Sequence, residues 1–184
     1  MAFDFEALAC KIEIATRKAF IHIQRQHPED DIYAFALYSD DGAMTVCAAA
    51  NSVEHLENAD LDQHRYYKFE PAEWKYEGSG FGEADSLLGE ICTIVRNRIT
   101  DIDDDDGGIQ FEEFQSRLYE TCIEVLKKLH GEGFFKQICG NDVFVTFSVT
   151  EYEFERAKIR EIISALNDND YRDEYLSWMK TWPA

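Results

Sequence analysis

The sequence predicts an α+β fold, in which a small, mainly antiparallel sheet of three to four strands packs with about five to six helices. Two apolar runs around an Asp-Gly pair predict a β-hairpin, whose strands must pair antiparallel. Several segments repeat apolar residues at three- and four-residue spacing, which is typical of helices that cover a sheet. A late segment rich in β-branched and aromatic residues predicts a further strand.

The chain is expected to begin with a long helix followed by the hairpin. Residues 3–26 place their apolar side chains on one helical face. Pro28 ends this helix, because the residue before a proline disfavours the helical conformation. The hairpin strands are expected at 32–38 and 43–49, joined by residues 39–42. Both strands are apolar at nearly every position, which predicts a sheet covered on both faces.

The next segment is expected to hold two short elements. Asn51 or Ser52 can cap a short helix that extends to about residue 62. Residues 65–69 (RYYKF) are rich in aromatic side chains and are expected to form a third strand. Pro71 then suits the first turn of a helix or a tight turn.

The second half of the sequence is expected to form mostly helices and one more strand. The clearest helix spans about 110–130, with Gly131 at the left-handed position that often ends a helix. Residues 142–150 (DVFVTFSVT) are expected to form the late strand. Three further helices are expected at 83–99, 153–167 and 171–182.

The length and hydropathy of the chain favour one globular domain over residues 1–184. No linker, internal repeat or low-complexity stretch divides it. No run of about 18 apolar residues occurs, so no membrane span is expected. Asp4 and Glu6 stand where a signal peptide requires positive charge, which indicates a cytoplasmic protein.

The charge is strongly negative and unevenly distributed. The chain has 37 Asp and Glu against 18 Lys and Arg, for a net charge of −19, yet 45% of its residues are hydrophobic, too many for a disordered acidic chain. Residues 26–64 and 99–116 contain many acids and no Lys or Arg. Nucleic-acid binding is not expected, because phosphate contacts require basic side chains. A basic protein partner is expected instead.

The cysteines and histidines predict no metal centre and no cofactor. The five cysteines are separated by at least 17 residues and include no CxxC pair, so we expect them to be reduced and structural. The five histidines form no HxxxH or HExxH pair, and no GxSxG sequence is present. No residue is therefore assigned a catalytic role.

Residues 101–113 hold the sharpest local motif, an aspartate run that looks like a calcium-binding loop. With Gly107 at the sixth position and Glu113 at the twelfth, Ile102 falls at the first position, where calcium requires an oxygen ligand. The preferred interpretation is therefore a solvated acidic turn, with weak cation binding as the alternative. Four of its residues are candidates for interaction with a partner: Asp103, Asp104, Asp105 and Asp106.

The glycine-rich segment GSGFG (78–82) precedes a predicted helix and could suggest a phosphate-binding loop. It lacks the Lys-Ser/Thr of a P-loop. Glu83 and Asp85 follow at once and would repel a phosphate. A flexible joint is the preferred interpretation.

Several segments together carry a resemblance to a known family. In chain order they are HPEDDIYAFALYSDDG, CAAANSVEHLE, YYKFEPAEWKYEG, VLKKLHGEGFF, DVFVTFSVTEYE and SALN. With these segments the chain resembles the mainly bacterial family domain of unknown function 4303 over about residues 3–167, which leaves 168–184 as a C-terminal helical extension. The resemblance implies no reaction and no catalytic residues. Asn51, Glu73 and Trp74 lie in the matching segments and are further interaction candidates.

Trp74 also belongs to a dense group of aromatic residues between 66 and 76, for which core packing and a binding surface are both open interpretations.

The combined observations favour a non-enzymatic, acidic protein-binding module. Some small families of this kind are immunity proteins encoded beside bacterial toxins, so a toxin-immunity role is included in the expectation. The alternatives are an enzyme that uses Glu73, His55 or Cys47, and weak divalent-cation binding at residues 101–113. The oligomeric state is left open.

Overall fold

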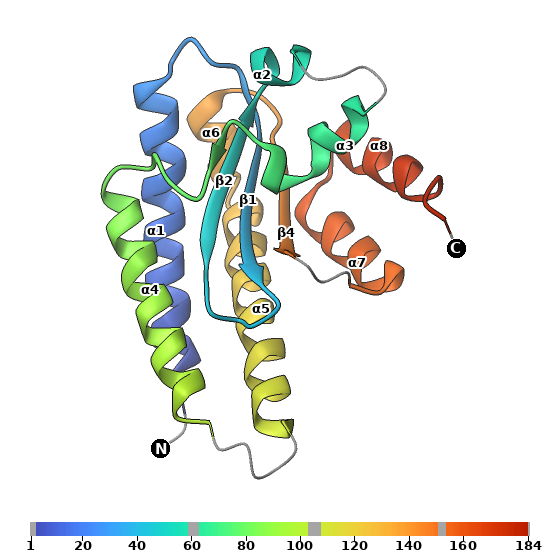
Figure 1. Cartoon of the computed structure of the whole chain (residues 1–184). Helices are drawn as coiled ribbons and strands as arrows, with labels where there is room; N and C mark the ends of the chain where they lie inside the picture. Colours follow the sequence, from blue (N-terminus) through green and yellow to red (C-terminus); the bar gives the residue numbers. More distant parts are fainter. Residues whose placement is uncertain (1–2, 59–62, 103–107, 151–153, 184) are drawn as a thin grey trace.

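A computed structural model describes residues 3–58, 63–102, 108–150 and 154–183, and shows a four-stranded sheet in the order β3-β2-β1-β4 (Figure 1). Its strands are β1 (Ile32–Asp40), β2 (Cys47–Ser52), β3 (Tyr76–Glu77) and β4 (Phe144–Thr150). β1 pairs antiparallel with β2 and parallel with β4, and β2 pairs antiparallel with β3. The predicted α+β class with a mainly antiparallel sheet is confirmed, although one pair of strands is parallel.

The helices surround this sheet on both faces (Figure 1). They are α1 (Phe5–Gln26), α2 (Val53–Glu57), α3 (His64–Phe69), the 3₁₀ helix η1 (Pro71–Glu73), α4 (Glu83–Thr100), α5 (Ile109–Gly131), α6 (Phe134–Cys139), α7 (Arg156–Leu166) and α8 (Asp170–Met179). No helix among the described residues is long and apolar enough to cross a bilayer.

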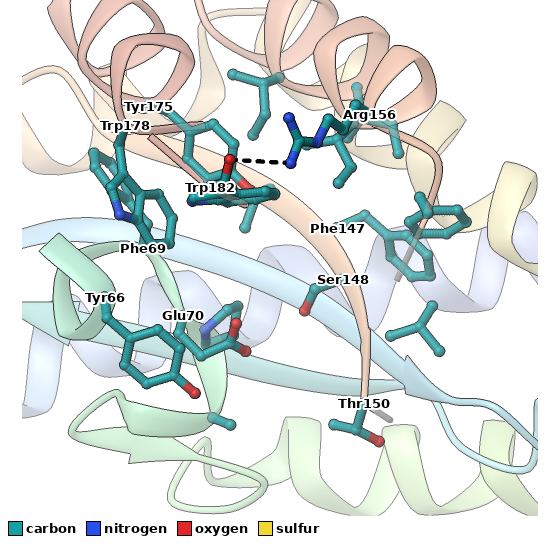
Figure 2. Close-up of a pocket in the computed structure, with 18 of the residues that line it drawn as sticks. Tyr66, Phe69, Glu70, Phe147, Ser148, Thr150, Arg156, Tyr175, Trp178 and Trp182 are labelled. Atoms are coloured by element: carbon teal, nitrogen blue, oxygen red, sulfur yellow. Dashed lines mark hydrogen bonds between the residues drawn. The ribbon is translucent and has the colours of Figure 1, made fainter. Parts of the chain in front are cut away.

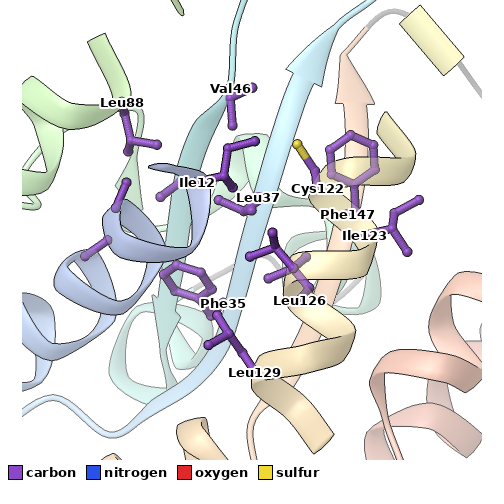
Figure 3. Close-up of a cluster of buried hydrophobic side chains, with 14 of the residues drawn as sticks. Ile12, Phe35, Leu37, Val46, Leu88, Cys122, Ile123, Leu126, Leu129 and Phe147 are labelled. Atoms are coloured by element: carbon purple, nitrogen blue, oxygen red, sulfur yellow. The ribbon is translucent and has the colours of Figure 1, made fainter. Parts of the chain in front are cut away.

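The larger core lies between the sheet and helices α1, α4, α5 and α6 (Figure 3). At its centre Phe20 of α1, Phe35 of β1 and Phe135 of α6 form a ring cluster with centroid distances of 5.1–5.6 Å. Figure 3 shows Leu37 of β1 between α1 and α5, beside Leu126. This face joins the long helices to the sheet through apolar contacts, which are the main driving force of folding.

A second core covers the opposite face of the sheet. Phe69 of α3 lies 4.9 Å from the ring of Phe144 on β4 and 5.1 Å from that of Tyr175 on α8. Ala34 and Ala36 of β1 face these rings, whereas Phe35 faces the larger core. Because apolar side chains point to both faces, β1 reads as a continuous apolar run, as the sequence predicted.

Residues 65–69 form part of helix α3, so the prediction of a strand there was wrong. The helix directs Phe69 into the second core while Tyr66 stays exposed. The place beside β2 is occupied by the short strand β3 instead. Tertiary burial of one aromatic residue has overridden a local preference for extended structure.

The turn of the hairpin is longer than predicted. β2 begins only at Cys47, and the Asp40 carboxylate organises the preceding loop by accepting hydrogen bonds from the Met44 N–H at 3.0 Å and from the Thr45 hydroxyl.

The left-handed glycine predicted at the end of α5 is Gly133 and not Gly131. Gly131 still belongs to the helix, whereas Gly133 has a positive φ of 68°.

Candidate functional site

A cavity of about 920 Å³ lies beside β4 and is the main candidate site; we refer to it as the β4 pocket (Figure 2). Residues 146–150 of β4 form its floor, the α3–η1 segment forms one wall, and α7, α8 and the following residues form the other. Its volume falls within the usual range for sites that bind small molecules.

The floor of the pocket follows from the alternation of β4. Phe147 packs into the larger core on one side of the sheet, whereas the neighbouring Ser148 and Thr150 side chains face the pocket (Figure 2). This is the two-residue period of a strand. The pocket therefore presents hydroxyl groups on its floor between apolar side walls.

One wall of the pocket is aromatic. Trp178 of α8 stacks on Phe69 with a centroid distance of 5.7 Å, and Trp182 meets Trp178 edge-to-face at 5.0 Å. Tyr66 lies across the pocket and is exposed. Large, rigid aromatic side chains are typical anchors for ligands and partner proteins.

Two charged residues, Glu70 and Arg156, lie on opposite sides of the pocket (Figure 2). Burial raises the pKa of the Glu70 carboxyl, although a hydrogen bond from the Ala72 backbone opposes this effect. Among the described residues, Glu70 forms no ion pair. On the opposite side the Arg156 guanidinium donates hydrogen bonds to the backbone carbonyls of Trp182, at 3.2 Å, and Pro183.

A second cavity, of about 460 Å³, is acidic and is called the acidic cleft here. Four carboxylates line it, those of Asp31, Asp142, Asp170 and Glu174. Two of them are paired with lysines, since Lys136 lies 2.8 Å from Asp142 and Lys68 lies 2.6 Å from Glu174. Within the described part of the chain, Asp31 and Asp170 have no such cation.

The predicted interaction candidate Asn51 is completely buried. Its side-chain amide donates to the Tyr33 hydroxyl at 3.0 Å, and its oxygen accepts from the N–H groups of Ser52 at 3.1 Å and Lys75 at 3.2 Å. Asn51 thus joins β2 to the segment before β3, and no surface of its side chain is free to meet a partner.

The structure places Glu73 and Trp74 beside the β4 pocket but not in its lining. Trp74 is 4% exposed and packs on Phe144, while Glu73 is partly exposed. The His55 ring lies 3.3 Å from the backbone oxygen of Glu73. None of Glu73, His55 and Cys47 lines the β4 pocket or the acidic cleft, so these cavities give no support to an enzyme built on them.

The candidates Asp103, Asp104, Asp105 and Asp106 lie outside the described residues. Their role in binding a partner, and cation binding at 101–113, therefore stay predictions. Among the side chains that the structure describes, no group of three or more His, Cys, Asp or Glu could hold a metal ion.

The GSGFG segment is held in place by an anion of the chain itself. The Asp85 carboxylate accepts hydrogen bonds from the N–H groups of Gly80 and Phe81 at 3.1 Å. Phe81 is fully buried, so the segment is anchored to the core rather than forming the expected flexible joint. Asp85 occupies the place that a phosphate would need, in agreement with the rejection of a phosphate-binding loop.

All five cysteines are free in the structure. The thiols of Cys47 on β2 and Cys92 on α4 are hydrogen-bonded to each other. The bond from Cys47 and another from the Val46 N–H, 3.3 Å from the Cys92 sulfur, lower the pKa of Cys92. The same pairing, together with burial, raises the pKa of Cys47.

Sequence reasoning reached Tyr66 and Phe69 of the β4 pocket only as members of the aromatic group at 66–76, and did not identify its other residues. Glu70, Arg156 and Trp178 come from three distant segments, which meet only because β4 inserts in parallel beside β1. The available signal was the family resemblance, because the segment YYKFEPAEWKYEG contains Glu70 and the segment DVFVTFSVTEYE contains the floor at 146–150.

Comparison with curated proteins found no match, and neither did comparison with solved structures. Comparison with protein families matched residues 12–168 to the domain of unknown function DUF4303. That match covers most of the chain and confirms the resemblance seen in the sequence, with a boundary that begins nine residues later than expected (12 − 3 = 9). The chain belongs to the DUF4303 family.

Proposed function

We propose that this protein is a binding module for a basic partner protein, and that the acidic cleft receives a Lys or Arg side chain of that partner. The observation that carries the proposal is the pair Asp31 and Asp170, two exposed carboxylates in one cavity without a paired cation among the described residues. A cationic side chain between them would offset their mutual repulsion.

The overall charge of the protein supports the same proposal. A net charge of −19 attracts basic proteins and orients them before contact. Asp31 belongs to the acidic block at 26–64. The fold places Asp142, Asp170 and Glu174 in the same cavity as Asp31. Blocking of a basic toxin by an immunity protein would be one instance of this kind of binding.

A lysine-rich peptide serves as the probe in a direct test. The double variant Asp31→Asn with Asp170→Asn keeps the side-chain shapes and removes both unpaired charges. We expect about tenfold weaker binding, because each exposed ion pair contributes up to about 1 kcal/mol and 1.4 kcal/mol corresponds to tenfold. The matched control Glu120→Gln with Glu124→Gln removes the same charge from exposed positions on α5.

The two variants separate a local site from general attraction. Weakened binding only in the cleft variant supports the proposal, and equal weakening in both variants contradicts it. Wild-type affinity should also fall between about 0.01 M and about 1 M salt, where the screening length shrinks from roughly 30 Å to roughly 3 Å. Affinity that is independent of salt would rule out a charge-driven complex.

A further inference from the structure

β4 is an edge strand whose outer side is only partly covered. In a parallel pair of strands, the N–H and C=O of one residue point to one side and those of the next residue point to the other. Val145 binds the Asn167 side chain with both its N–H and its C=O, so these groups point away from β1. The backbone groups of Phe147 and Val149 follow the same alternation and also point away from β1.

The outward groups of Phe147 and Val149 open onto the β4 pocket. Both residues line it, and no described residue supplies a hydrogen bond to their outward backbone groups. Within the described residues, the edge of the strand is thus hydrogen-bonded by Asn167 at Val145 and lacks a hydrogen-bond partner two residues further on. An uncovered edge offers a row of donors and acceptors that fits another strand.

We propose that the β4 pocket binds an extended segment of another polypeptide, which adds to β4 as a fifth strand at Phe147 and Val149. Strand addition of this kind takes affinity from main-chain hydrogen bonds and specificity from pockets for alternate side chains. The floor at 146–150 is five residues long, or roughly 16 Å at 3.3 Å per residue, which suits such a segment.

The walls of the pocket define the chemistry of this segment. Trp178 and Tyr175 offer an aromatic surface to an apolar or aromatic side chain of the peptide. Glu70 on the facing wall is largely buried without an ion pair among the described residues, and a Lys or Arg of the peptide would supply the missing charge. The segment is therefore expected to combine an apolar residue with a basic one.

A phage-displayed library of random peptides, selected on the whole chain, is the probe for this site. Selection uses the Asp31→Asn, Asp170→Asn variant, so that basic peptides held by the acidic cleft are not enriched. Enriched peptides should contain a Lys or Arg. They should bind at least about tenfold more weakly to Ala72→Trp, which fills the pocket from an exposed position on η1. The matched control is Ala7→Trp, an exposed position on α1.

Two further measurements separate strand addition from binding through side chains alone. Bound peptide should slow amide hydrogen exchange at Phe147 and Val149 but not at Val145, whose N–H is already bonded. Peptides with methylated nitrogen atoms at alternate residues should lose binding. Absence of enriched peptides, binding unaffected by Ala72→Trp, or retained binding of every methylated peptide would each overturn the proposal. Because the cleft is disabled throughout, failure of the charge-driven function leaves this test unaffected.

Discussion

The side-chain amide of Asn167 replaces a neighbouring strand at Val145. Its oxygen accepts from the Val145 N–H at 2.8 Å, and its nitrogen donates to the Val145 C=O, also at 2.8 Å. The same nitrogen lies 3.1 Å from the Ile163 carbonyl at the end of α7. Asn167 thus closes the edge of β4 at Val145 and ties the last turn of α7 to the sheet.

We expect Asn167→Ala to lower the free energy of unfolding by about 3 kcal/mol. The change leaves the Val145 N–H and C=O buried without partners, at a cost of about 1–3 kcal/mol for each such group. Denaturant unfolding measures the difference. Asn97→Ala, at an exposed position on α4, is the control and should change stability by less than about 0.5 kcal/mol. Equal stability of the two variants would contradict this role of Asn167.

Asn51, predicted from the sequence as an interaction candidate, is expected to stabilise the fold instead. Asn51→Ala removes three hydrogen bonds in the second core, and we expect a loss of about 3 kcal/mol. Tyr33→Phe removes the hydroxyl that accepts from Asn51 and donates to the Lys68 carbonyl at 2.9 Å, and should cost about 2 kcal/mol. Thermal and denaturant unfolding distinguish the two. Wild-type stability of Asn51→Ala would show that these bonds contribute nothing.

Two glycines near α4 should respond in opposite directions to the same substitution. Gly82 has a φ of 62°, and an added Cβ would lie 2.5 Å from the His22 ring, so Gly82→Ala should cost about 2 kcal/mol. Gly89 is exposed within α4 with no atom near its Cβ position, so Gly89→Ala should stabilise the protein by up to about 1 kcal/mol. Unfolding curves of both variants check this, and a change of the same sign in both would refute it.

The Cys47–Cys92 pair predicts a pH dependence. The hydrogen bond from Cys47 lowers the pKa of Cys92, so Cys47→Ala should raise that pKa towards its ordinary value, while Cys47→Ser retains a donor and should raise it less. The ultraviolet absorbance of the thiolate, compared with Cys92→Ser, follows the titration. An unchanged Cys92 pKa in Cys47→Ala would contradict the interaction.

The direction of the shift also sets its effect on stability. The pKa of Cys92 is lower in the folded state than in the unfolded state. The Cys92 thiolate therefore contributes its full stabilisation above the unfolded-state pKa of about 8.5. This stabilisation is lost as the pH falls through the folded-state pKa of Cys92. In the Cys47→Ala variant this part of the pH dependence should shrink.

Long helices with a regular repeat of apolar residues could be predicted from the sequence, whereas short elements could not. The 22-residue α1 and the 23-residue α5 repeat their apolar residues over several turns, so the local pattern alone defines them. The six residues of α3 carry too little pattern, and the burial of Phe69 decides their conformation. The two-residue β3 exists only because β2 offers its edge.

The sequence by itself determined the helical faces, the strands that are apolar on both sides and the acidic blocks, since each depends on residues close together in the chain. Only the tertiary structure decided that Asn167 closes the edge at Val145 and that Asp31 and Asp170 line one cavity. It also decided that Glu70, Trp178 and β4 enclose one pocket. These contacts join residues far apart in sequence, and they follow from the parallel placement of β4 beside β1, which no local pattern encodes.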